Sequence, residues 1–470
     1  MLTVGFSTRN ITPSIGAFIP GLFERRKATG VADDLLARAA VLDDGAQTIA
    51  IVQVDTIALP NSVVLDARRH IQRETGIAPS SCLLAATHTH SGGPVADLFS
   101  TPCDLAYLKH LGERIAEAVI EAHANRRKCV VGTSVSHAPG VAFNRRFVMK
   151  DGTQVTHPGK MNPAIDYVAG PADDTVTVIG FADPKSRRPF GCIVQFACHA
   201  THMNGFEFSA DYPHWIAQTL QGAYGEEFGV VFLNGPCGDI TQVDNQSSRP
   251  LECGPYWCER TGRAVGGAAL HALAIADYFS SASIDTATVG VSAAIRQAST
   301  KDLEKAKQRL KGVATDCEDV DVSYAREMLA VDALRRKCAT ASLEIQGVRI
   351  ADTFLWTAPG EVFQAFATDV RARSPFTKTI GVELANGYFG YICTPEAYSG
   401  GGYEVRLARS SMLEETAGHT IADAASRLAE LMHGRARKEL SRLSKKRTWP
   451  TVVDTALDAL NELERRRRTK

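Results

Sequence analysis

Five short segments of the sequence gather histidine, glutamate, arginine and tyrosine next to glycine or proline. They contain His88 and His90 in ATHTHSGG, Arg145 and Arg146 in AFNRR, His199 and His202 in FACHATHMNG, Glu361 in TAPGE, and Tyr388, Tyr391, Tyr398 and Tyr403 in NGYFGYICTPEAYSGGGYE. Imidazole nitrogens and a carboxylate oxygen commonly bind zinc, and a catalytic site keeps one position open for water. The residue types therefore allow a catalytic metal site, if the fold brings the segments together.

The two histidines of the first segment follow an apolar run that is typical of a buried strand. Residues two apart share a face of a strand, so His88 and His90 either point into one cavity or diverge where the strand ends. A hydrogen-bonded core histidine is the structural alternative. Glu361 follows Pro359 and Gly360 at an expected helix start, where the helix dipole favours a glutamate whether or not it binds a metal.

The elements expected to position these residues alternate along the chain. Residues 35–42 and 48–59 predict a hairpin around Asp-Asp-Gly, residues 62–76 predict a helix closed by a glycine, and a strand follows before His88. Asp104 is expected to cap a long helix. This pattern predicts an α/β fold with a parallel or mixed sheet covered by helices, in which ligands bind at the carboxyl ends of strands.

The remainder of the chain shows little chemistry. Residues 299–342 predict a charged helical excursion, and we expect a catalytic domain over 1–433 followed by a basic helical extension over 434–470. With 44% hydrophobic and 22% charged residues and a net charge of zero, the composition favours a globular protein over one that binds nucleic acid or a membrane surface. The sequence shows no signal peptide and no membrane span, so we expect a cytoplasmic protein without stable membrane association.

Taken together and in order, the five segments resemble the neutral (alkaline) ceramidase family of zinc-dependent amidases, as the catalytic domain of a short bacterial-type relative without the immunoglobulin-like C-terminal domain. The resemblance rests on THTHSGG, FNRR, FACHAT, PGE and NGYFGYICTPEAYSGGGYE. It implies two mixed sheets flanked by helices. It also implies a Zn²⁺ site formed by His88, His199, Glu361 and Tyr391.

The same resemblance assigns active-site roles to His90, Arg145 and Tyr403. The family's GDVSPN segment appears here as GDITQVDN, which places Thr241 at the position of the family serine. We also expect Asp239 and Asp211 to orient the metal-bound histidines, with an Asx turn or helix cap as the structural alternative. His202 lacks a family counterpart and remains a candidate for the pocket wall.

These observations predict a zinc-dependent hydrolase that cleaves the N-acyl C–N bond of a small soluble substrate by metal-activated water. An esterase or lactonase with the same zinc site is one alternative, and a non-catalytic metal-binding relative is another. The expected partner is a small molecule, and a homo-oligomer is compatible with the sequence.

Overall fold

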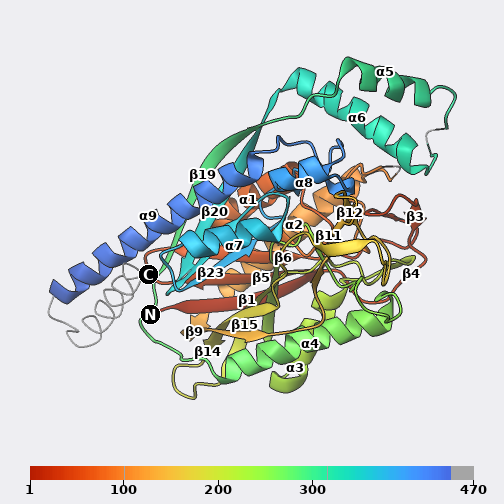
Figure 1. Ribbon diagram of the computed structural model, residues 1–470. Coiled ribbons are helices and arrows are strands. Elements are labelled where there is room, and N and C mark those ends of the chain that lie inside the picture. Colours follow the sequence, from red (N-terminus) through yellow and green to blue (C-terminus); the bar gives the residue numbers. More distant parts are fainter. Residues whose placement is uncertain (100, 315, 446–470) are drawn as a thin grey trace.

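The computed structural model describes residues 1–99, 101–314 and 316–445, and its strands form three larger mixed sheets (Figure 1). The first sheet has the order β7-β6-β5-β1-β8 and contains β1 Thr3–Asn10, β5 Leu36–Asp43, β6 Thr48–Val54, β7 Cys82–Ala86 and β8 Arg127–Lys128. The second has the order β17-β15-β14-β9 and contains β9 Val130–His137, β14 Thr175–Ala182, β15 Pro189–Phe196 and β17 Gly229–Asn234. The third has the order β19-β20-β21-β23 and contains β19 Ile284–Ala294, β20 Thr340–Ile350, β21 Thr353–Thr357 and β23 Lys378–Val382.

Each larger sheet contains one parallel pair whose strands are connected through a helix. The three units are β6-α1-β7, β15-α3-β17 and β21-α7-β23, with α1 at Asn61–Thr75, α3 at Tyr212–Tyr224 and α7 at Gln364–Arg373. The other pairs of these sheets are antiparallel. The predicted mixed α/β class is confirmed, although the strands divide among three larger sheets and not two. Local sequence signals mark strands but do not state which strands pair.

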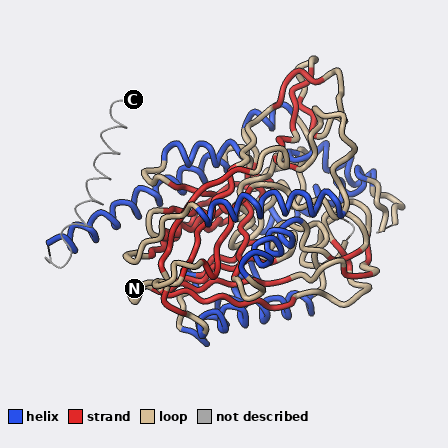
Figure 2. Tube along the Cα trace, turned by 90° about the horizontal axis from the view of Figure 1, so that it is seen from below, coloured by secondary structure: helices blue, strands red, loops and turns tan. Residues whose placement is uncertain are grey.

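Helices cover the outer faces of the sheets, and apolar side chains fill the space between the layers. Two helices, α1 and α2 Leu105–Ala124, pack on the first sheet, while α3 and α4 Pro255–Ala274 pack on the second. The third sheet is covered by α7 and by the long α9 Ala417–Lys445. A further core contains side chains from all three sheets. Figure 2 shows the strands enclosed by helices on several sides.

The local predictions of the first hundred residues are confirmed. The expected hairpin is the antiparallel pair β5–β6, and α1 ends at Gly76 with a left-handed φ of 76°. Asp104 caps α2 by accepting hydrogen bonds from the amides of Ala106 and Tyr107. Turn and cap signals depend on contacts between residues close in sequence, so they form in the same way whatever the tertiary packing.

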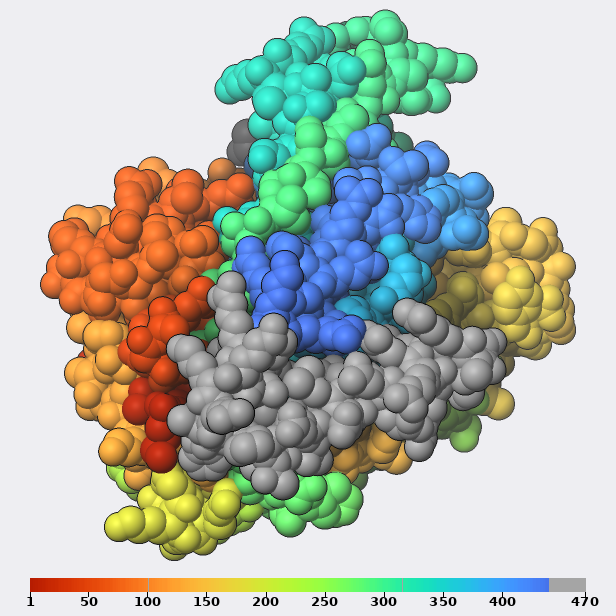
Figure 3. All heavy atoms as spheres, turned by 90° about the vertical axis from the view of Figure 1, so that its left-hand side faces the viewer, coloured from red at the N-terminus to blue at the C-terminus, as the bar shows by residue number. Residues whose placement is uncertain are grey.

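The charged segment predicted to be helical forms α5 Thr300–Arg309 and α6 Val320–Lys337 between the paired strands β19 and β20. Figure 3 shows this pair standing out from the rest of the surface. The expected boundary at residues 433 and 434 lies inside α9, and residues 446–470 of the expected basic extension lie outside the described residues. In the part of the chain that the structure describes, no helix has the length and apolarity to cross a bilayer.

Short elements complete the chain around the ends of the main strands. The two-residue strands are β2 Phe18–Ile19, β3 Arg26–Lys27, β4 Gly30–Val31, β10 Phe143–Asn144, β16 Glu207–Phe208, β18 Ile240–Thr241, β22 Glu361–Val362 and β24 Tyr391–Ile392. A small antiparallel sheet contains β11 Arg146–Met149, β12 Gln154–Thr156 and β13 Ile165–Val168, and the remaining short helices are α8 Pro395–Gly400, η1 Pro79–Ser81 and η2 Tyr403–Val405.

Phe6 of β1 packs the first sheet against the second. Its ring lies 5.9 Å from the ring of Phe181, and it occupies the space above two glycines, Gly191 and Gly229. A Cβ atom placed on Gly229 would come within 2.2 Å of Cγ of Phe6. The glycines therefore let an aromatic ring fit between two sheets.

We predict that Gly229→Ala lowers the free energy of unfolding by about 1–3 kcal/mol, because the added methyl overpacks the contact with Phe6. The matched control is Gly290→Ala in β19, where a Cβ atom meets open space. Urea denaturation of both variants measures the effect. Equal stability of the two variants would contradict this account of the packing.

Candidate metal centre

His88 lies in the loop that follows the first parallel pair. The strand β7 ends at Ala86, and His88 adopts a left-handed φ of 67°, which is uncommon for a residue with a side chain. Its amide donates to the carbonyl of Thr56, and its Nδ1 lies 2.7 Å from the carbonyl oxygen of Ile57. A carbonyl only accepts, so Nδ1 carries the proton and Nε2 presents a lone pair.

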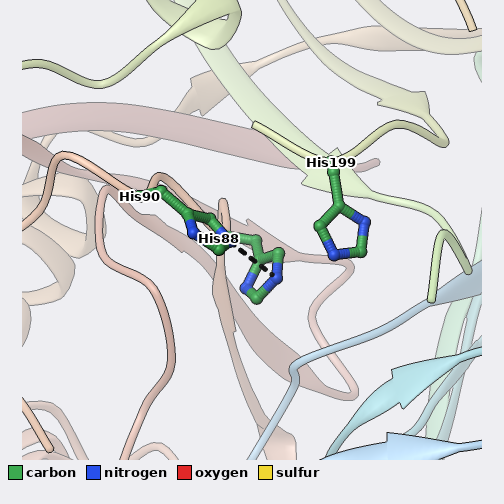
Figure 4. A group of neighbouring side chains, drawn as sticks. All are labelled: His88, His90 and His199. Atoms are coloured by element: carbon green, nitrogen blue, oxygen red, sulfur yellow. Dashed lines mark hydrogen bonds between the residues drawn. The ribbon is translucent and has the colours of Figure 1, made fainter. Parts of the chain in front are cut away.

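Two further histidines have the same tautomer for the same reason. Nδ1 of His199, which follows β15, donates to the carbonyl of Cys237 at 2.7 Å, and Nδ1 of His90 donates to the carbonyl of Gly21 at 3.0 Å. The candidate ligand nitrogens of the three histidines lie within 4.8 Å of one another (Figure 4). Among the described residues these histidines form a group that could bind a metal ion.

Glu361 brings a carboxylate to the same place. Its Oε2 lies 3.3 Å from Nε2 of His88 and 3.4 Å from Nε2 of His199, while its Oε1 accepts from the Tyr388 hydroxyl at 2.8 Å. The expected helix start at Glu361 was wrong, because Glu361 lies in β22 and α7 begins three residues later. The parallel bridge between β22 and β24 sets Glu361 beside Tyr391.

Two buried atoms at the centre of the site lack hydrogen-bond partners. They are Nε2 of His199 and Oε2 of Glu361, both on side chains that are almost fully buried. Buried polar atoms are normally paired, so an orphaned lone pair facing an orphaned carboxylate oxygen needs a cation or a proton between them. The donor set of imidazole nitrogens and a carboxylate fits Zn²⁺.

The ionisation of the site follows from burial and from these neighbours. Burial lowers the pKa of His199 to about 3, with a further decrease from the Arg145 charge, and burial also holds the pKa of His90 well below its ordinary value. Both imidazoles are therefore neutral near pH 7, the form that binds metals. Burial opposes charge on His88 and on Glu361 as well, but their mutual attraction raises the pKa of His88 and holds that of Glu361 well below its usual range.

Arg145 and the two assigned tyrosines form the neighbouring wall. Arg145 donates to the Tyr391 hydroxyl at 3.2 Å and to the carbonyl of Gly238 at 2.6 Å, and its guanidinium lies 5.3 Å from the centre of the Tyr403 ring. The rings of Tyr391 and Tyr403 meet edge to face at 6.0 Å. The structure thus brings together these three residues with Glu361, as the motifs indicated.

Thr241 lies near this wall, but its hydroxyl is directed elsewhere. It is buried in β18 opposite Phe143, two residues before Arg145, and its hydroxyl donates to Oε1 of Gln242 at 3.0 Å. The same amide oxygen accepts from the Thr201 hydroxyl at 3.0 Å. A catalytic role for Thr241 remains a prediction.

Three expectations about supporting residues were wrong. Asp211 and Asp239 do not orient the presumed metal-binding histidines, because backbone carbonyls accept those Nδ1 protons. Asp211 instead caps α3 and bonds Nδ1 of His202 at 2.8 Å, and Asp239 accepts from Asn144 at 2.7 Å. His202 is fully buried with both ring nitrogens bonded, so it is a core histidine and not part of a pocket wall.

The structure also shows supporting residues that the motifs did not indicate. Glu404 is fully buried and pairs with Nε of Arg145 at 3.2 Å and with Arg146 at 2.7 Å. Arg26, also fully buried, donates to the carbonyl of His90 at 2.6 Å. Glu404 directly follows Tyr403 in the sequence. Its position next to an assigned active-site residue could have marked it as a partner for the adjacent arginines Arg145 and Arg146.

Comparisons with known proteins bear on the fold of the chain. No protein-family model matches the sequence, and no curated protein matches it. Among solved structures, the chain is similar to the neutral ceramidase from Pseudomonas aeruginosa, with a TM-score of 0.71, 19% identity, and coverage of 92% of this chain and 75% of that one. A second structure, described as a ceramidase complexed with C2, gives a TM-score of 0.71, 17% identity and the same coverage.

The chain therefore has a neutral ceramidase-like fold. This confirms the fold that the motifs predicted by resemblance. At these identities the likeness concerns the arrangement of the backbone and not the chemistry of the side chains.

We predict that Tyr388→Phe weakens zinc binding about 10- to 100-fold, because Glu361 loses the hydroxyl that orients its Oε1. Competition with a chromophoric chelator measures the affinity. Tyr398→Phe is the matched control, since the Tyr398 hydroxyl donates to the carbonyl of Leu413. If both variants bind zinc as the unmodified protein does, Tyr388 does not support the site.

Proposed function

We propose that this protein is a zinc-dependent hydrolase that cleaves the C–N bond of an N-acyl compound by water, with a small soluble amide as its substrate. One observation carries the proposal. Nε2 of His88 and Nε2 of His199 face Oε2 of Glu361 inside the protein, and this oxygen has no hydrogen-bond donor. The ceramidase-like fold supports amide hydrolysis as the reaction.

The residues that would hold the metal are His88, His199, Glu361 and Tyr391. The tautomers support this set, since both imidazoles direct Nε2 toward Glu361 while Nδ1 is fixed by a carbonyl. When bound, zinc polarises a carbonyl oxygen and lowers the pKa of a water from 15.7 to about 7.

His90 is suited to move the proton. Its Nε2 lies 3.4 Å from Nε2 of His88, and its Nδ1 donates to the carbonyl of Gly21. The neutral ring can therefore take a proton at Nε2 and pass it to the leaving amine without rotating. The backbone contact from Arg26 holds the loop in place during this transfer.

Arg145 and Tyr403 would stabilise the negative charge that develops on the carbonyl oxygen. Glu404 and the carbonyl of Gly238 fix the guanidinium before substrate arrives, so little reorganisation is needed during the reaction. Loss of one such donor typically lowers kcat by roughly 10²–10³-fold.

We predict that His88→Ala loses bound zinc, whereas His90→Ala keeps zinc and loses roughly 10²–10⁴-fold in kcat. The first change removes a ligand, and the second removes only the proton carrier. Metal analysis of both variants after purification without chelators, together with turnover, separates the two roles. Equal loss of metal in both variants would show that His90 is also a ligand.

The reaction class can be tested on the unmodified protein with N-acyl amino acids, N-acyl sugars, short-chain ceramides, esters and lactones. We expect about one equivalent of zinc and turnover of a soluble amide that stops on chelation and returns with zinc. Turnover that survives in His88→Ala would rule out the metal mechanism. Activity confined to ceramides would contradict the proposed soluble substrate.

A further inference from the structure

His157 is an imidazole next to the site that the proposed reaction does not yet use. It directly follows β12, and its amide donates to the carbonyl of Arg145 at 2.9 Å. Arg146 and Thr156 are partners in the antiparallel pair β11–β12, so Arg145 and His157 are the next residues in the same register. Directly opposite residues on antiparallel strands lie on the same face. The backbone thus sets His157 beside the arginine that contacts Tyr391.

The tautomer of His157 follows from a buried neighbour. Asn245 is buried, and its side-chain Nδ2 lies 3.4 Å from Nδ1 of His157. An amide nitrogen only donates, so Nδ1 is the acceptor and Nε2 carries the proton. His157 has a left-handed φ of 52°, a strained conformation of the kind found at ligand-binding positions.

His157 is exposed to solvent although protein surrounds its ring. Burial lowers the pKa of the imidazole to about 4, and the charge of Arg145 lowers it further. The ring is therefore neutral near pH 7, and its one N–H is available at the surface beside Arg145.

Charged side chains of the segments near His157 in the chain and in space are paired with one another. Lys160 contacts Glu252 at 2.5 Å, and Arg249 contacts Asp244 at 3.1 Å. Arg145 is paired with Glu404, as described above. A ligand carboxylate would therefore have to compete with existing ion pairs, whereas an uncharged oxygen needs only a neutral donor.

We infer that His157 is a specificity-determining residue of the proposed hydrolase, and that its Nε2–H donates to an uncharged oxygen of the substrate. This inference rests on the proposed function and adds the recognition of a hydroxyl or carbonyl group next to the scissile amide. The oxygen belongs either to the amine or to the acyl part of the substrate, and the choice of substrates distinguishes them.

The experiment compares matched amides that share one acyl chain. N-acylethanolamine against N-acylethylamine tests a hydroxyl on the amine, N-(2-hydroxyacyl)ethylamine tests one on the acyl group, and N-acylglycine tests a carboxylate. We expect one hydroxylated amide to exceed its parent about tenfold in kcat/KM, the effect of one additional hydrogen bond in the complex.

Two variants test whether His157 causes this preference. Asparagine tolerates the left-handed backbone but is too short to reach, so His157→Asn should reduce the tenfold ratio to about one. Glutamine carries an amide N–H at about the reach of Nε2, so His157→Gln should restore part of the ratio. His137→Asn, at an exposed histidine of β9 paired with Asp174, is the control.

A measurement independent of turnover examines the same geometry. Nitrogen-15 NMR of the imidazoles, assigned by loss of the signal in His157→Asn, should show a neutral Nε2–H tautomer for His157 at pH 7. Predominance of the Nδ1–H tautomer would overturn the inference.

The kinetic outcomes separate this inference from the proposed function. Zinc-dependent turnover with a hydroxyl preference that His157→Asn leaves unchanged would overturn the role of His157 alone, as would turnover without such a preference. A preference for N-acylglycine that disappears in His157→Asn would overturn the uncharged oxygen. Absence of turnover with every amide would overturn both.

Discussion

The centre of this molecule depends on how the negative charge of Glu361 is compensated inside the protein. Its Oε2 faces Nε2 of two imidazoles whose Nδ1 protons are already donated to backbone carbonyls. Leaving a carboxylate uncompensated in such surroundings costs several kcal/mol. A proton shared with His88 satisfies part of this demand, and a divalent cation satisfies it more completely, because it also accepts the lone pair of His199.

The fold positions these groups with the same unit, a parallel strand pair connected by a helix, in each of the three larger sheets. Each parallel strand pair has a connecting helix, and the chain leaves the carboxyl end of a strand at the site: His88 after β7, His199 after β15 and Glu361 after β21. Because the three strand ends belong to separate sheets, the three side chains meet although each lies within a few residues of its own strand. Apolar cores between the layers, in turn, fix how the sheets lie relative to one another.

Much of this arrangement could be predicted where a local signal decides it, as in the hairpin β5–β6 and the caps of α1 and α2. The motifs also selected residues that converge in the structure. Local patterns failed where a distant partner decides the outcome. Glu361 lies in a strand because it pairs with β24, and His202 is a core residue because Thr261, 59 positions later, bonds its second nitrogen.

The insertion of α5 and α6 enters and leaves the third sheet at one point, since Ala294 and Thr340 are register partners. Its length and sequence can therefore change in evolution while the sheet keeps its pairing. Yet α6 contacts the segment that carries Tyr403, through the pair of Glu327 with Arg409 and the bond from the Tyr324 hydroxyl to the carbonyl of Tyr403. Changes in this one module would therefore reach the segment that carries Tyr403 without disturbing the pairing of the third sheet.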